Sequence, residues 1–135
     1  MVFSKESFCK SERLCSKKAI TGLFEDGNSF FSFPFQVVWR ISPSEISFPA
    51  QVMFSVSKKG FKLAVKRNLI KRRIKEAYRK NKHTLYNFLI SENLKIIFIV
   101  IFNDNTIPGY TMVEKSIKEM FGVFIRILNE YLQKC

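Results

Sequence analysis

Apolar and polar positions alternate along two stretches in the first half of the chain, with the period of two that is typical of β-strands. Between positions 30 and 41, every odd position from 35 is apolar, whereas the even positions include Gln36 and Arg40. Positions 49–57 alternate in the same way. Positions 94–102 are apolar on both faces and rich in β-branched residues, which predicts a central strand buried on both sides.

Other segments carry apolar residues at the spacing of helices. Residues 16–27 predict a short helix, with a serine that can cap its start and a glycine that can end it. A second helix is expected over residues 63–80, and residues 81–89 either continue it or form a short further helix. Residues 110–133 predict a closing amphipathic helix. This order of elements is typical of a two-layer α+β sandwich.

Length and composition favour one globular domain. The chain has 135 residues and is 47% hydrophobic, which suits a single core without internal repeats or linkers. The longest apolar run, at positions 96–102, is far shorter than the roughly 20 residues that a membrane span requires. No signal peptide is visible at the N-terminus. We therefore expect a cytoplasmic protein of one domain over residues 1–135, with residues 1–10 as a flexible segment.

The cysteines and the histidine do not form a site. Cys9, Cys15 and Cys135 include no close pair, and the single histidine, His83, is remote from all three. Zinc sites use closely spaced pairs of ligands, so free thiols are expected and a metal is not. His83 lies in a polar run that is typical of a solvated helix. No acid–base or nucleophile constellation occurs, so we expect the protein alone to be catalytically inactive.

Positive charge is concentrated in one short stretch of the chain. The sequence has 23 Lys and Arg against 11 Asp and Glu, for a net charge of +12. Twelve of the basic residues lie between Lys58 and Lys82, where Glu76 is the only acidic residue. Solvated helices normally mix the two signs, whereas this stretch concentrates one. A polyanionic partner would offset the resulting repulsion.

A helical wheel separates this helix into two faces. At about 100° per residue, Ile70, Ile74 and Ala77 form a core stripe with Tyr78 at its edge, and Leu69 falls outside it. We expect Leu69 to be at least half exposed. The neighbouring arc holds Arg67, Asn68, Lys71, Arg72, Lys75 and Arg79. These cations suit phosphate oxygens, and an amide can also reach a sugar or base edge. A solvated helix and a membrane-surface helix remain alternatives.

The residues around this helix resemble a known signature. The chain reads Phe-Ser-Val-Ser-Lys-Lys over residues 54–59 and Ala-Val-Lys-Arg-Asn-Leu-Ile-Lys-Arg-Arg-Ile-Lys-Glu-Ala-Tyr-Arg over residues 64–79. Both segments closely resemble the protein subunit of bacterial ribonuclease P, and residues 23–27 and 35–39 are similar to its first helix and first long strand. The resemblance covers roughly residues 10–130. It implies an αβββαβα sandwich with a left-handed βαβ crossover, like the second domain of a small-subunit ribosomal protein.

The resemblance also implies a function. In this family the protein binds a catalytic RNA, and the holoenzyme removes the 5′ leader of precursor tRNA. Catalysis belongs to the RNA, with Mg²⁺ expected in the holoenzyme and no cofactor bound by the protein. The expected partners are therefore the ribonuclease P RNA and the leader of precursor tRNA, without a membrane or DNA.

The expected site residues fall into two groups. For contacts with the RNA subunit, the resemblance matches Lys58, Lys59, Arg67, Asn68, Lys71, Arg72 and Lys75, and Lys62, Lys66 and Arg79 of the same basic run are expected to join them. For the leader cleft, the resemblance matches Ile20, Phe24 and Val38, and Gln36 and Arg40 are expected there because they share the strand face of Val38. The chain departs from the family pattern where Leu69 replaces an arginine and where Ile20 and Val38 replace common aromatic residues. Phe24 has the alternative of being a core residue.

Two other classes of function fit the composition. The main rival is a ribosomal or assembly protein that binds structured RNA without taking part in catalysis. A protein that binds a membrane surface or an acidic protein is the third interpretation. Composition alone does not separate these classes, whereas the ordered signature over residues 57–79 favours ribonuclease P.

Overall fold

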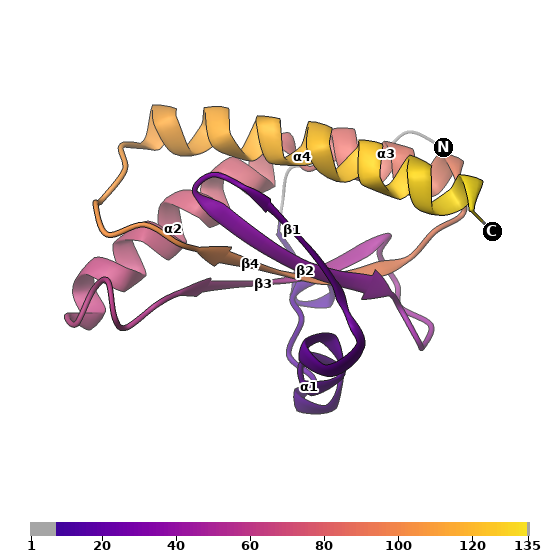
Figure 1. The fold of residues 1–135 in the computed structure, drawn as a ribbon, viewed down its shortest axis with the longest axis horizontal. Coiled ribbons are helices and arrows are strands. Elements are labelled where there is room, and N and C mark those ends of the chain that lie inside the picture. The colour runs from indigo at the N-terminus through magenta and orange to yellow at the C-terminus, as the bar shows by residue number, and fades with distance from the viewer. Residues whose placement is uncertain (1–7, 135) are drawn as a thin grey trace.

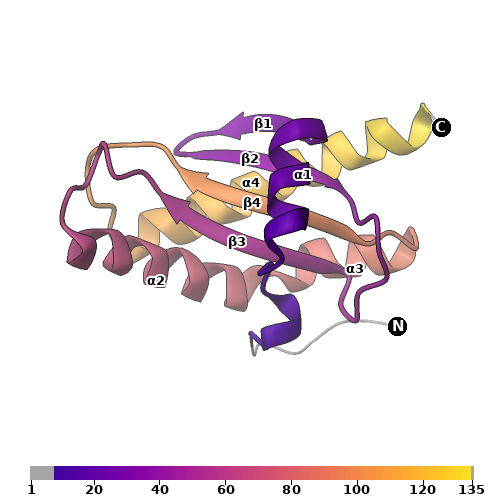
Figure 2. The same cartoon turned by 90° about the horizontal axis from the view of Figure 1, so that it is seen from below.

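The computed structural model describes residues 8–134 as one α+β unit (Figure 1). The elements in chain order are a short 3₁₀ turn η1 (Lys10–Glu12), α1 (Lys17–Asp26), β1 (Asn28–Ser32), β2 (Phe35–Ile41), β3 (Ala50–Val56), α2 (Ala64–Asn81), α3 (His83–Ser91), β4 (Ile96–Phe102) and α4 (Tyr110–Gln133). Helices α2, α3 and α4 lie on one face of the sheet, and α1 crosses the other face (Figures 1 and 2).

The four strands form one mixed sheet in the order β1-β2-β4-β3. Strands β1, β2 and β4 pair antiparallel, whereas β3 at the edge runs parallel to β4. Helices α2 and α3 connect these two parallel strands. In Figure 2, which is seen from the side of α1, this connection passes behind the sheet and is left-handed. The α+β class and the unusual hand of the crossover are both as expected.

One expected element differs from the structure, and one open alternative is resolved by it. The stretch expected as one strand from residue 30 is a hairpin, because β1 ends at Ser32 and β2 begins at Phe35. Pro34 has no N–H for a strand ladder, and alternation continues across the turn, which is why the pattern hid the break. Residues 83–91 form the separate helix α3, so the second of the two alternatives for this segment is confirmed.

The two faces of the sheet have separate cores. On the α4 face, Phe98 and Trp39 both pack against Phe124, with ring centroids 5.3 and 5.8 Å apart, respectively. On the α1 face, a smaller cluster contains Leu23 of α1 and Ile99 of β4, both fully buried. Strand β4 is covered on both faces, which explains why its sequence is apolar without alternation.

The core stripe of α2 is confirmed, because Ile70, Ile74, Ala77 and Tyr78 are all fully buried. The expectation for Leu69 is wrong, since this side chain is partly buried and not half exposed. Arg72 and Arg73 lie three and four residues further along α2, the spacing at which long helical side chains are neighbours and can cover one another. A helical wheel gives the direction of each side chain, but it does not show how far long neighbouring side chains shield it from solvent.

The N-terminal residues that the structure describes are packed against α2. The ring of Phe8 lies 5.8 Å from that of Tyr78 and 6.1 Å from that of Phe54. Phe8, within the segment expected to be flexible, therefore lies against the rest of the fold, and residues 1–7 of that segment lie outside the described part. The expected N-cap of α1 is present, because the Ser16 hydroxyl accepts a hydrogen bond from the Ala19 N–H at 3.3 Å.

Candidate RNA-binding surface

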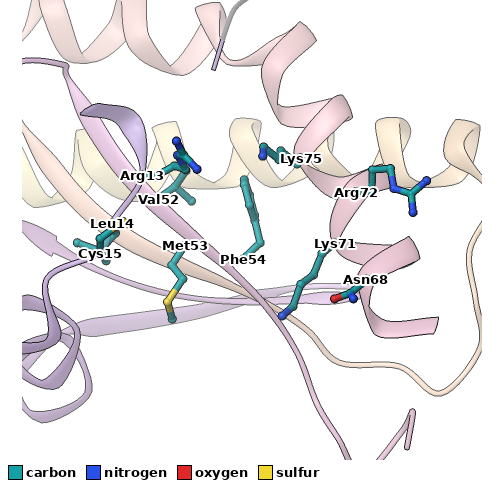
Figure 3. Close-up of a pocket in the computed structure, with 10 residues that line it drawn as sticks. All are labelled: Arg13, Leu14, Cys15, Val52, Met53, Phe54, Asn68, Lys71, Arg72 and Lys75. Carbon is teal, nitrogen blue, oxygen red and sulfur yellow. The ribbon is translucent and has the colours of Figure 1, made fainter. Parts of the chain in front are cut away.

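A groove of about 390 Å³ lies between α2, the edge strand β3 and the segment that precedes α1 (Figure 3). Its lining consists of Arg13, Leu14, Cys15, Val52, Met53, Phe54, Asn68, Lys71, Arg72 and Lys75. The side chains of Asn68 and Lys71 reach from α2 toward β3, and Arg72 extends outward (Figure 3). The groove therefore has a cationic wall on α2 and a partly apolar floor on β3.

The second wall of the groove is held against the edge of the sheet. The Leu14 N–H donates a hydrogen bond of 2.9 Å to the carbonyl of Val52 on β3, and Arg13 forms a bridge with the same residue. Arg13 is exposed and adds a cation that faces those of α2 across the groove. The sequence offered no signal for Arg13, because it lies far from the basic run in the chain.

The basic residues of α2 do not all face the groove. One guanidinium nitrogen of Arg67 donates to the carbonyls of Phe61 and Lys62, at 2.6 and 2.9 Å, and so holds the loop before α2. Arg79 forms an ion pair with Glu76 at 2.5 Å. This contact lowers the pKa of the Glu76 carboxyl, chiefly through the hydrogen bond from Arg79. Both arginines thus have contacts within the protein.

The remaining cations expected to bind RNA are open to solvent. Lys58, Lys59 and Lys62 are exposed in the loop that follows β3, and Lys66 is exposed on the first turn of α2. Lys75 is exposed as well, and its ammonium group lies 5.5 Å from the centre of the Phe8 ring. The structure therefore brings most of the expected cations to one continuous edge, formed by α2 and the preceding loop.

The residues expected in the leader cleft lie around α1. Phe24 is 60% exposed, so the alternative of a core residue is wrong. Ile20 is partly buried, and Gln36 is exposed on the sheet. Val38 is only 8% exposed and belongs to the cluster beneath α1, so its side chain offers little surface to a ligand.

Arg40 is separated from the other expected cleft residues by α1. A Cβ on Gly22 would lie 3.1 Å from the Arg40 guanidinium, so this side of α1 faces Arg40. Gly22 and Phe24 are about 160° apart on a helix, so Phe24 is on the opposite flank. Arg40 instead lines a second hollow of about 680 Å³, together with Pro43 and Ser44.

One lysine of the basic run is buried in an ion pair that the sequence did not reveal. Lys82 Nζ lies 2.5 Å from Glu12 Oε1, and both side chains are fully buried. Tyr86 donates to the same carboxylate oxygen at 2.9 Å, and the Cys9 N–H donates to Oε2 at 2.7 Å. These contacts tie η1, and with it the second wall of the groove, to the junction of α2 and α3.

The buried tyrosines complete this cluster as hydrogen-bond donors. Burial raises the pKa of Tyr86 and that of Tyr78 far above the usual value, so both hydroxyls keep their protons. The two hydroxyl oxygens are 2.9 Å apart. Because the Tyr86 hydroxyl already donates its hydrogen bond to the Glu12 carboxylate, the Tyr78 hydroxyl is the donor to the Tyr86 oxygen. The chain of donors stabilises the buried carboxylate.

The other reactive residues lie apart from the groove or form no site. His83 is exposed at the start of α3, as expected for a solvated position. Cys9 and Cys15 are reduced cysteines that form no disulfide, and Cys135 lies outside the described residues. Within residues 8–134, no group of three or more His, Cys, Asp or Glu side chains is placed to hold a metal ion. No helix in this range is long and apolar enough to span a membrane.

The fold is of the α+β class, and its cation-lined groove is typical of proteins that bind RNA. The family model described as Ribonuclease P matches residues 8–124. A ribonuclease P protein component from Porphyromonas gingivalis is 36% identical over 112 residues, which cover 82% of this chain and 80% of that protein. One from Chlorobium phaeobacteroides is 28% identical over 124 residues, covering 84% and 85%.

Solved structures of similar proteins show the same fold. A ribonuclease P protein from Staphylococcus aureus superimposes with a TM-score of 0.64 at 21% identity, covering 84% of this chain and 95% of that one. One from Thermotoga maritima also gives a TM-score of 0.64, at 20% identity, covering 82% and 94%. The chain therefore belongs to the ribonuclease P protein family, whose members are the protein subunits of an endoribonuclease.

Proposed function

We propose that this chain binds the ribonuclease P RNA through the cationic edge of α2 and the preceding loop, and binds the 5′ leader of precursor tRNA on the sheet face beside α1. The observation that carries the proposal is the groove, whose lining combines Lys71, Arg72 and Lys75 of α2 with Arg13 of the opposite wall and with residues of β3. Opposed cations neutralise phosphates, and an apolar floor accommodates the faces of unpaired bases.

The protein acts as a binding subunit in this proposal. The lining of the groove includes four cations, an amide and the Cys15 thiol but no carboxylate or histidine, which suits binding of phosphates better than hydrolysis. Hydrolysis belongs to the RNA with Mg²⁺ in the holoenzyme, and the process takes place in the cytoplasm. The protein contributes by strengthening the binding of the substrate and by neutralising the charge of RNA backbones that approach each other.

Reconstitution with a bacterial ribonuclease P RNA at low magnesium tests this function. We expect the protein to stimulate removal of the 5′ leader, and the double variant Lys71→Ala/Arg72→Ala to bind the RNA more weakly. The matched control is Lys115→Ala/Lys118→Ala, which removes the same charge from exposed positions of α4. This control should retain almost all of the stimulation.

The same experiment distinguishes the proposed function from that of the main rival class. A ribosomal or assembly protein would bind an unrelated structured RNA as tightly as the ribonuclease P RNA and would not stimulate cleavage. An equal loss of binding in the α2 and α4 variants would show that only net charge matters, which contradicts the assignment of the α2 edge.

A further inference from the structure

Two phenylalanines at the tip of the β1–β2 hairpin are open to solvent. Phe31 and Phe33 are each 55% exposed, and their ring centroids lie 6.3 Å apart in an edge-on arrangement. Single exposed apolar residues are common, but two neighbouring aromatic rings at one hairpin form a concentrated apolar surface. Neither ring is needed to fill the two cores described above.

The backbone places Phe31 on the same face of the sheet as α1. The preceding residue, Phe30, packs on Phe124 of α4 at 5.2 Å between ring centroids, so it points to the other face. Successive side chains of a strand alternate between faces, which directs Phe31 toward the α1 side. The pairing of the strands then sets one row across this face: Phe31, Gln36, Ile101 and Ser55.

This row runs beside the exposed flank of α1. Gly22 and Arg40 mark the flank of α1 that faces away from Gln36, so Phe24 lies on the flank nearer to the row. With neighbouring strands about 4.8 Å apart, four strands span about 14 Å from β1 to β3. The row is therefore a shallow floor with an exposed aromatic residue of α1 along one side.

The far end of the floor joins the cationic groove. Met53 lies two residues before Ser55 on β3, and it belongs both to the cluster beneath α1 and to the lining of the groove. Met53 thus links the two regions, with the Phe31–Phe33 pair at one edge of the sheet and Lys71 of α2 beyond the other. Aromatic rings and cations at opposite ends of one track are what an unpaired nucleic acid strand requires.

We propose that Phe31 and Phe33 form a stacking platform for unpaired nucleotides of the 5′ leader, at the end of the track farthest from α2. The proposal rests on the proposed function of the chain, which it extends by naming a binding position on β1. Stacking on a ring does not depend on the identity of the base, so this contact tolerates different leader sequences. It also provides aromatic surface that Ile20 and Val38 do not offer.

Variants of the first ring test stacking directly. Phe31→Leu keeps an apolar side chain but removes the aromatic face, whereas Phe31→Trp keeps a face for stacking. Met112→Ala on α4, 51% exposed in the wild type, is the control for removing an exposed apolar side chain elsewhere. Affinity would be measured for the reconstituted holoenzyme with precursor tRNA carrying a leader of about two or about ten nucleotides, a span within one single-strand binding site.

We expect Phe31→Leu to weaken binding of the long-leader substrate about fivefold or more, and Phe31→Trp to bind it as well as the wild type. The short-leader substrate should bind all variants equally, because its leader does not reach β1. If Phe31→Leu binds the long leader as tightly as the wild type does, while the wild type still prefers long over short leaders, the stacking platform is wrong but the proposed leader site stands. A wild-type protein without any preference for long leaders would instead contradict the proposed leader site as a whole.

The same preparations test the competing explanation that the pair mediates self-association. Strand β1 is an edge strand, and such edges can pair with a second copy of the chain. Sedimentation should show a monomer for both wild type and Phe31→Leu. A wild-type dimer that Phe31→Leu dissociates would assign the rings to self-association and overturn the proposal.

Discussion

Lys75 and Lys82 lie seven residues apart in the same basic run, but the protein uses them in opposite ways. Lys75 is exposed and lines the groove, whereas Lys82 is fully buried against Glu12. A surface cation is available to phosphates and contributes little to folding. A buried cation contributes to the fold only while its partner carboxylate is in place. The tertiary environment of each position, and not the residue type, therefore decides its function.

The buried pair of Glu12 and Lys82 also has a structural purpose. Glu12 belongs to η1, directly before the segment that forms the second wall of the groove. Its ion pair with Lys82 therefore holds this wall relative to α2. Changes at the buried pair should reduce stability first, whereas changes on the exposed edge should reduce RNA binding without affecting the fold.

The largest effect is expected for Lys82→Met. This variant leaves the Glu12 carboxylate buried without its cation, which should lower the free energy of unfolding by about 3–5 kcal/mol. Urea denaturation measures the change, with Lys80→Met as a control at an exposed position. The control should change stability by less than about 0.5 kcal/mol. Equal effects of the two variants would contradict the distinction between buried and exposed lysines.

A double variant sharpens this result. Glu12→Leu/Lys82→Met removes both charges together, and we expect it to be more stable than Lys82→Met alone, because no uncompensated charge is left in the core. If the double variant is as unstable as the sum of the single changes, packing and not charge is the cause.

An intermediate effect is expected for Arg67→Ala, because this residue contributes to both regions. Its guanidinium holds the carbonyls of Phe61 and Lys62, so its loss should lower the free energy of unfolding by about 1–2 kcal/mol. The loop with Lys58 and Lys59 should also lose its fixed position, which weakens RNA binding. Thermal denaturation and RNA titration together check this expectation. A variant that affects binding alone would show that Arg67 is a simple surface cation.

A smaller effect is expected for Leu69→Arg, which restores the residue common in the family. Leu69 is partly buried, so its replacement should cost about 1 kcal/mol of stability or less. The added charge should make the log–log dependence of RNA binding on salt steeper by up to about one unit. Leu69→Gln is the control, because it loses the same apolar contact without adding charge. A loss of several kcal/mol in both variants would mean that Leu69 belongs to the core.

The sequence could predict the features of this molecule that depend on local periodicity. The buried stripe of Ile70, Ile74 and Ala77 follows from the repeat of 3.6 residues, and the cationic arc beside it follows from the same geometry. The left-handed crossover followed only from the resemblance to a family, since spacing between elements does not determine the hand of a connection.

Contacts between distant segments could not be predicted in this way. Glu12 and Lys82 are 70 residues apart, and nothing in the pattern around either one indicates that they meet. The same limit explains why Arg40 was grouped with Phe24, although α1 separates them. Residues that share a strand face need not share a cleft when a helix crosses that face.

Arg72 and Arg73 provide the most direct test of the division between RNA-binding and internal cations, because they are neighbours of the same type. Arg72 lines the groove, whereas Arg73 donates a hydrogen bond of 2.5 Å to the carbonyl of Pro108. The measurement is the salt dependence of binding to ribonuclease P RNA for each alanine variant, together with its free energy of unfolding. We predict that Arg72→Ala lowers the log–log slope by up to about one unit with unchanged stability, and that Arg73→Ala lowers stability by about 1 kcal/mol with a smaller change in slope. Equal slopes and equal stabilities for the two variants would contradict the account.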